Sequence, residues 1–128
     1  MRFDIKSRWE RAVTLMQEQR IDALFLMKPA NLAYLTGDGR LCALGLFTQS
    51  LDCVVSVPTC DYREVEAVSR ATEVRAFKSE EDMFHGFREV IRRLGLEQAT
   101  IGLEKNFFDA ALFEVFKTHI LPLSLIHI

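Results

Sequence analysis

The sequence predicts one α/β domain in which a mixed sheet, with parallel and antiparallel strands, is flanked by helices. Segments with helical spacing alternate with short apolar runs along all 128 residues, a length that suits one domain. Several runs are continuously apolar, as in strands that are covered on both faces. Two of them, 41–48 and 51–57, are separated only by a Gln-Ser turn. So short a connection predicts an antiparallel hairpin within the sheet.

The composition is that of an ordinary globular protein, with 49% hydrophobic and 27% charged residues. A net charge of −2 gives no electrostatic reason to expect a nucleic acid partner. Basic and acidic residues are interspersed, and no apolar run is long enough to cross a bilayer, so we expect no membrane partner. Cys42, Cys53 and Cys60 form no Cys-x-x-Cys pair, which favours reduced, mostly buried thiols and a cytoplasmic location.

Two long amphipathic helices stand out. The first is predicted from Ser7 to about Arg20, with Ser7 and Glu10 in the form of a capping box. Its inner face is Trp9, Ala12, Val13 and Met16. The second follows Ser79, a predicted cap, and ends at Gly95. Its apolar positions repeat at three and four residues: Met83, Phe84, Phe87, Val90, Ile91 and Leu94.

The remaining elements are shorter. A helix is predicted from a cap-like Asp61 to about Ala71, and another over 109–117. Further strands are predicted over 21–27, 72–77 and 100–104.

The stretch 27–37 shows the organisation most clearly, as a strand, a short helix and a turn. Pro29 suits the first turn of a helix, because its missing N–H would have no helical partner there. Leu32 and Leu35 fall on one face, and Gly37 stands where a helix needs a residue that tolerates positive φ in order to end.

A search for catalytic groups finds no self-sufficient active site. The histidines are His85, His119 and His127, and none has metal-ligand spacing. No serine lies in a Gly-x-Ser-x-Gly elbow, and Gly37-Asp38-Gly39 lacks the third glycine of a phosphate-binding loop. We therefore predict no catalytic residue and no metal site in this chain.

The last eight residues, 121–128, continue no pattern of the preceding chain, so we place the domain at 1–120. The tail is either a final edge strand or a non-native run appended where a longer reading frame was cut. We favour the second interpretation, and no function is assigned to His127.

At this point the motifs resemble a known family. Arg11 and Met16, the run 21–26, and Asn31-x-x-Tyr34-Leu35-Thr36-Gly37 resemble the N-terminal domain of the creatinase and Xaa-Pro peptidase (aminopeptidase P, prolidase) family. Ile101-Gly102-Leu103-Glu104 is similar to the strand that this family places before the last helix of the domain. The resemblance covers about residues 5–118, and its most specific part is the Asn-x-x-Tyr-Leu-Thr-Gly run.

The resemblance implies a supporting domain rather than a catalytic one. In the family a following "pita-bread" domain, absent here, often binds two divalent metals (Mn, Co or Zn), which would activate water and polarise the scissile carbonyl. The implied partners are this missing catalytic domain and further copies of the chain in a homodimer or tetramer. The N-terminal domain would also wall one side of a partner subunit's active site. We expect the 128-residue chain to be inactive alone.

Four residues are candidates for contact with substrate: Asn31, Tyr34, Asp38 and Arg40. Arg40 has the fork geometry to bind a substrate carboxylate, and loops at sheet ends carry specificity. Each candidate also has a purely structural interpretation. Asn31 would be a satisfied amide at the helix start, and Tyr34 would be a core ring whose hydroxyl reaches the rim. Arg40 would be a solvated side chain.

Two other functions stay open. One alternative is a free-standing α/β binding or oligomerisation module without a peptidase domain. A less favoured one is a small-molecule sensor, which would need a pocket at the C-terminal ends of the strands. The sequence does not settle the parent's substrate, its metal dependence or its oligomeric state. Creatinase-like members of the family lack the metals, so the parent reaction is also open.

Overall fold

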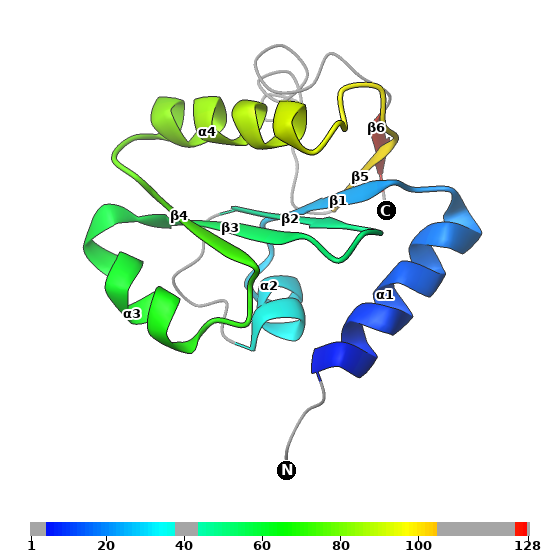
Figure 1. Cartoon of the computed structure of the whole chain (residues 1–128), viewed down its shortest axis with the longest axis horizontal. Helices are drawn as coiled ribbons and strands as arrows, with labels where there is room; N and C mark the ends of the chain where they lie inside the picture. The colour runs from blue at the N-terminus through cyan, green and yellow to red at the C-terminus, as the bar shows by residue number, and fades with distance from the viewer. Residues whose placement is uncertain (1–4, 38–43, 105–124, 128) are drawn as a thin grey trace.

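The computed structural model describes residues 5–37, 44–104 and 125–127, and within them a mixed sheet of six strands carries helices on both faces (Figure 1). The strand order is β4-β3-β2-β1-β5-β6. The strands are β1 (Ala23–Leu26), β2 (Leu44–Thr48), β3 (Cys53–Pro58), β4 (Glu73–Phe77), β5 (Ile101–Leu103) and β6 (Leu125–His127). The predicted fold class is confirmed.

The pairing combines both strand directions. β2 pairs antiparallel with β1 and with β3, so the predicted hairpin is confirmed. β4 runs parallel to β3, and β5 runs parallel to both β1 and β6. The parallel strand β4 follows β3 through the short helix α3 (Tyr62–Val68), as a parallel connection requires a crossover.

The two faces of the sheet have separate cores. Helix α4 (Glu80–Arg93) covers one face, and α1 (Ile5–Gln19), α2 (Pro29–Thr36) and α3 lie on the other (Figure 1). Alternate strand residues divide between them: Phe25 packs with Phe87 of α4, and Phe47 packs with Trp9 of α1. Both faces are covered, which explains why the strands read as continuous apolar runs.

Helix α1 differs from the prediction at its start. It begins at Ile5, so Ser7 lies inside the helix and the predicted capping box is wrong. The inner face is confirmed: Met16 is buried and Trp9 is half-buried against the same core.

Helix α4 matches its prediction at both ends. The Ser79 side chain accepts a hydrogen bond from the Asp82 N–H, and Gly95 has a φ of +70° just beyond the helix. Its predicted apolar residues all lie in or against one core. Helix α3 ends at Val68, earlier than predicted, and Asp61 makes no side-chain cap there.

Some predictions concern residues that the structure does not describe. These are Cys42 and the helix predicted over 109–117. Cys53 is buried as expected, whereas Cys60 is exposed, so the expectation of buried thiols holds for only one of the two that the structure describes. Residues 125–127 form the edge strand β6 beside β5, and whether the tail is native stays a prediction.

Candidate functional site

The site is built around helix α2, whose N-terminus is held by the side chain of Glu104, a residue much further along the sequence. The Glu104 carboxylate follows β5 and is 6% exposed. It accepts hydrogen bonds from the Met27 N–H at 2.5 Å and the Lys28 N–H at 2.8 Å. It also accepts one from the Asn31 side-chain amide at 2.5 Å.

This arrangement replaces a local helix cap. Lys28 occupies the N-cap position and provides no side-chain cap, and Pro29 has no N–H to satisfy. A carboxylate at a helix N-terminus faces the positive end of the helix dipole, which stabilises its charge. Glu104 thereby joins the end of β5 to the end of β1, because β1 and β5 run parallel as neighbours.

The C-terminal carbonyls of α2 are satisfied in a similar way. Gly37 adopts a φ of +87° and its N–H donates to the Ala33 carbonyl. The remaining three carbonyls accept from residues outside the helix: Tyr34 O from Arg8 Nη1, Leu35 O from Trp9 Nε1 and Thr36 O from Arg70 N, at 2.8, 2.7 and 2.9 Å. Both ends of α2 are therefore fixed by neighbouring elements.

Tyr34 lies on the outward side of α2. It is 40% exposed, and the Arg8 guanidinium lies over its ring, 5.1 Å from the centroid. Such a contact is a cation–π interaction. Tyr34 is thus neither a core ring nor free of contacts: its exposed side remains available to a partner.

A cavity of about 360 Å³ opens between α1 and α2, over β1. We call it the α1–α2 groove. Its walls are Arg11, Leu15 and Gln19 of α1 and Asn31 and Tyr34 of α2, and Leu24 lies between them. A volume of this size lies within the range of small-ligand pockets, roughly 300–1,000 Å³.

The structure thus brings two of the four predicted site residues together. Asn31 and Tyr34 both line the α1–α2 groove, whereas Asp38 and Arg40 lie outside the described residues. Sequence reasoning missed Glu104 as the partner of Asn31. The available signal was that both residues belong to the two motifs that carried the family resemblance.

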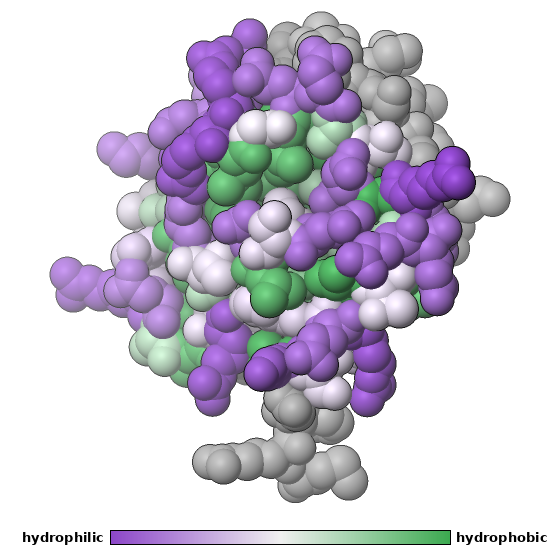
Figure 2. Space-filling view, turned by 45° about the vertical axis from the view of Figure 1, so that its right-hand side comes forward, coloured by the Kyte–Doolittle hydropathy of each residue, from purple (hydrophilic) through white to green (hydrophobic). Residues whose placement is uncertain are grey.

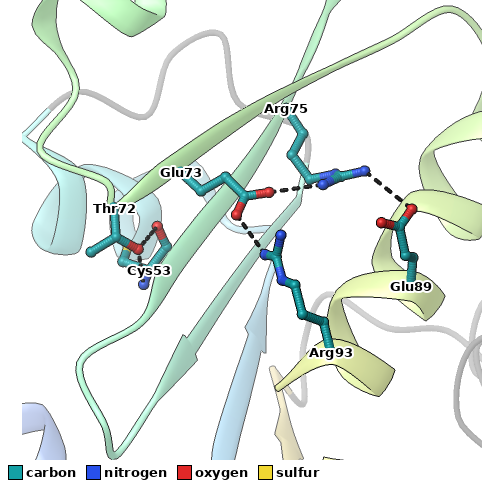
Figure 3. Close-up of polar contacts among 6 residues, drawn as sticks. All are labelled: Cys53, Thr72, Glu73, Arg75, Glu89 and Arg93. Carbon is teal, nitrogen blue, oxygen red and sulfur yellow. Dashed lines mark hydrogen bonds and ion pairs between the residues drawn. The ribbon is translucent and has the colours of Figure 1, made fainter. Parts of the chain in front are cut away.

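A second polar cluster lies on the opposite face, between β4 and α4 (Figure 3). Glu73 accepts from Arg75 at 2.8 Å and from Arg93 at 2.5 Å. Partial burial opposes ionisation of Glu73, but the hydrogen bonds from the two arginines prevail and lower its pKa. Arg75 also lies 3.7 Å from Glu89, so the cluster ties the edge strand to the helix.

Two searches of the described residues give negative results. No three His, Cys, Asp or Glu side chains within 5–37 and 44–104 gather as a metal-binding group. Among residues 5–37, 44–104 and 125–127, no helix combines the length and apolar character that a membrane span requires.

The family model of the Creatinase/Prolidase N-terminal domain matches residues 8–126. Solved structures share the fold at low identity. The Xaa-Pro dipeptidase from Bacillus anthracis is 12% identical with a TM-score of 0.82, and the match covers 98% of this chain and 34% of that one. The X-Pro aminopeptidase from Thermotoga maritima is 21% identical with a TM-score of 0.78, covering 94% and 33%.

A third structure contains little beyond the domain itself. It is the Creatinase/Prolidase N-terminal domain of an X-Pro dipeptidase from Streptococcus pyogenes, 17% identical with a TM-score of 0.76. The match covers 95% of this chain and 93% of that one. A search of curated protein sequences finds no significant match.

The fold and the site thus define a mixed α/β domain in which a remote glutamate caps a short helix beside β1. The chain belongs to the Creatinase/Prolidase N-terminal domain family. It spans about a third of the length of the Bacillus and Thermotoga enzymes, at 34% and 33%.

Proposed function

We propose that this chain is the non-catalytic N-terminal domain of an Xaa-Pro peptidase-like hydrolase. The observation that carries the proposal is the family match over residues 8–126. It is supported by fold similarity to enzymes whose names include X-Pro aminopeptidase and Xaa-Pro dipeptidase. The chemistry would belong to a metal-binding domain that follows in the parent chain, and the parent would be cytoplasmic.

The domain's role in this proposal is to shape a partner subunit's active site and to build a homodimer or tetramer. The geometry of α2 suits that role, because both ends of the helix are fixed while the Tyr34 ring remains 40% exposed. Asn31 contributes by holding Glu104, and Tyr34 offers the contact surface. Asp38 and Arg40 complete the proposed substrate-adjacent set, with Arg40 binding a carboxylate.

The first experiment is to determine the reading frame beyond Ile120 in the source genome. We expect an in-frame domain with two Asp, one His and two Glu as metal ligands. A natural stop codon at this point would contradict the proposal and favour a free-standing binding or oligomerisation module.

The second experiment compares two purified proteins in an Xaa-Pro dipeptide hydrolysis assay with and without added Mn²⁺. We expect turnover by the full-length parent and none by the 128-residue chain. In the parent, Arg40→Gln should raise KM and leave the bound metal unchanged. Turnover by the short chain that disappears with Asp38→Asn or Arg40→Gln would show that the domain is itself catalytic.

A further inference from the structure

We propose that the α1–α2 groove binds an amphipathic monocarboxylate, a molecule whose apolar body ends in a carboxylate. The groove shares Asn31 and Tyr34 with the supporting role proposed above, but ligand binding there does not depend on that role. Three features of the described residues carry it: the shape of the groove, its apolar floor and the charge at its rim.

The floor of the groove is preformed and apolar. Met16, Ile21, Leu26 and Leu35 all line it, and each is buried by its packing in the core below. Leu24 of β1 is only half-buried. An apolar ligand that covers Leu24 would remove its remaining apolar surface from water, which stabilises the complex by roughly 25 cal/mol per Å².

The mouth of the groove is open to solvent. Leu15 is 57% exposed and Tyr34 is 40% exposed, two of the four large hydrophobic side chains that the described chain leaves exposed. They stand on opposite walls, one on α1 and one on α2. Figure 2 shows one face of the molecule, on which hydrophobic residues in green are exposed between hydrophilic residues in purple. An apolar body can therefore enter between the two walls.

The rim supplies a cation for the ligand's charge. Arg11 lines the groove and makes no hydrogen bond or ion pair with any described residue. Its neighbours one helical turn away are Ser7, Arg8, Thr14 and Leu15, so the helix offers it no carboxylate at these positions. A guanidinium with this freedom binds a carboxylate through two parallel hydrogen bonds.

The acidic residue nearest to the opposite wall does not cancel this charge. Glu104 contacts Asn31, but it is 6% exposed and its oxygens already accept from two backbone N–H groups and the Asn31 amide. The groove therefore presents an apolar floor and a positive rim, which together select an amphipathic anion over a neutral apolar molecule.

The test is a titration of the 128-residue chain with sodium octanoate at low salt, followed by calorimetry and by NMR shifts of the methyl groups. We expect saturable binding at one site, with shifts concentrated on Leu15 and Leu24. 1-Octanol, which has the same chain without the carboxylate, should bind about tenfold more weakly, since a hydrogen bond to a charged group contributes that much affinity.

Two variants separate the contributions of charge and apolar surface. Arg11→Gln should weaken octanoate about tenfold and leave octanol unchanged, because it removes only the charge. Leu15→Asp should weaken octanoate further, since it adds a carboxylate one turn from Arg11 at an exposed position. Arg63→Gln, an exposed arginine on α3 away from the groove, is the matched control and should change nothing.

Two results would overturn the proposal. One is the absence of saturable octanoate binding by a chain whose circular dichroism shows it to be folded. The other is equal affinity for octanoate and octanol that is insensitive to Arg11→Gln, which would mean apolar adhesion without carboxylate recognition.

Discussion

Helices α2 and α4 lie on opposite faces of one sheet and are specified in opposite ways. Helix α4 has 14 residues and contains its own signals: a Ser79 cap, three acidic residues in the first turn and two arginines in the last. Helix α2 has eight residues, no side-chain cap of its own and no charged residue in its terminal turns. Its ends are held by Glu104, Arg8, Trp9 and the backbone of Arg70.

The difference shows where each helix obtains its stability. A helix of eight residues is marginal by itself in water, since nucleation costs more than so few hydrogen bonds return. Helix α2 therefore depends on tertiary contacts that form only when β5, α1 and α3 are in place. We expect substitutions that act on α2 from a distance to cost more than substitutions of α4's own signals.

The largest effect is expected for Glu104→Ala. The change removes the acceptor of two backbone N–H groups and of the Asn31 amide, in hydrogen bonds that are partly buried. Each hydrogen bond to the charged carboxylate contributes about 1 kcal/mol or more, so the free energy of unfolding should fall by about 3 kcal/mol. Urea unfolding followed by circular dichroism measures this loss.

The matched control is Glu97→Ala, an exposed acid in the loop before β5, with an expected change within about 0.5 kcal/mol. Asn31→Ala should cost less than Glu104→Ala, because it leaves the two backbone bonds in place. Equal stabilities of the Glu97 and Glu104 variants would refute the dependence of α2 on its remote cap.

A pair of glycines gives the second comparison. A Cβ on Gly45 of β2 would lie 2.5 Å from Leu32 Cδ2, and Leu32, with 1% exposure, has no room to withdraw. Gly45→Ala should therefore destabilise the chain by about 2 kcal/mol through overpacking beneath α2.

Gly86→Ala is the same substitution within α4. The atom nearest to its new Cβ would be Arg75 Nε at 3.5 Å, an ordinary contact. Replacing glycine inside a helix gains up to about 1 kcal/mol, so we expect Gly86→Ala to be neutral or stabilising. Thermal unfolding of the two variants checks the opposite signs, and a stabilising Gly45→Ala would show that α2 packs more loosely than described.

The third prediction concerns the local cap of α4. Ser79→Ala removes the acceptor of the Asp82 N–H and should cost about 1 kcal/mol. Asp61→Ala at the start of α3 is its counterpart, and it should change stability by less than about 0.5 kcal/mol, since Asp61 makes no side-chain cap. Chemical denaturation of both variants measures the two losses in unfolding free energy. It tests whether the stabilisation requires the observed side-chain hydrogen bond or only a cap-type residue at the helix start.

These comparisons also explain what the sequence could predict. The ends of α4 follow from Ser79 and Gly95, because capping acts over three or four residues. The hairpin follows from its two-residue turn. The start of α1 was misplaced, since the pattern of Ser7 and Glu10 also fits inside a helix. The bond from Glu104 to Asn31 joins residues 73 positions apart, and no local pattern encodes it.

The smallest expected effect belongs to the Glu73 cluster on the α4 face. The folded chain lowers the pKa of Glu73, because hydrogen bonds from Arg75 and Arg93 outweigh the opposing effect of partial burial. A carboxyl with a lowered folded pKa stabilises the protein above its unfolded pKa and loses that contribution as the pH falls through the folded value. The pairs are partly exposed, so the contribution should stay below about 1 kcal/mol.

The measurement is the difference in unfolding free energy between the unmodified chain and Glu73→Gln from pH 7 to pH 3, at low salt. The difference cancels the titration of the other carboxylates and isolates Glu73. We expect this free-energy difference to favour the unmodified chain at pH 7. It should shrink as the pH falls below 4.5, the ordinary pKa of a glutamate. Added salt should also reduce it. A difference that persists at pH 3 would mean that Glu73 acts through packing on β4 and not through its charge.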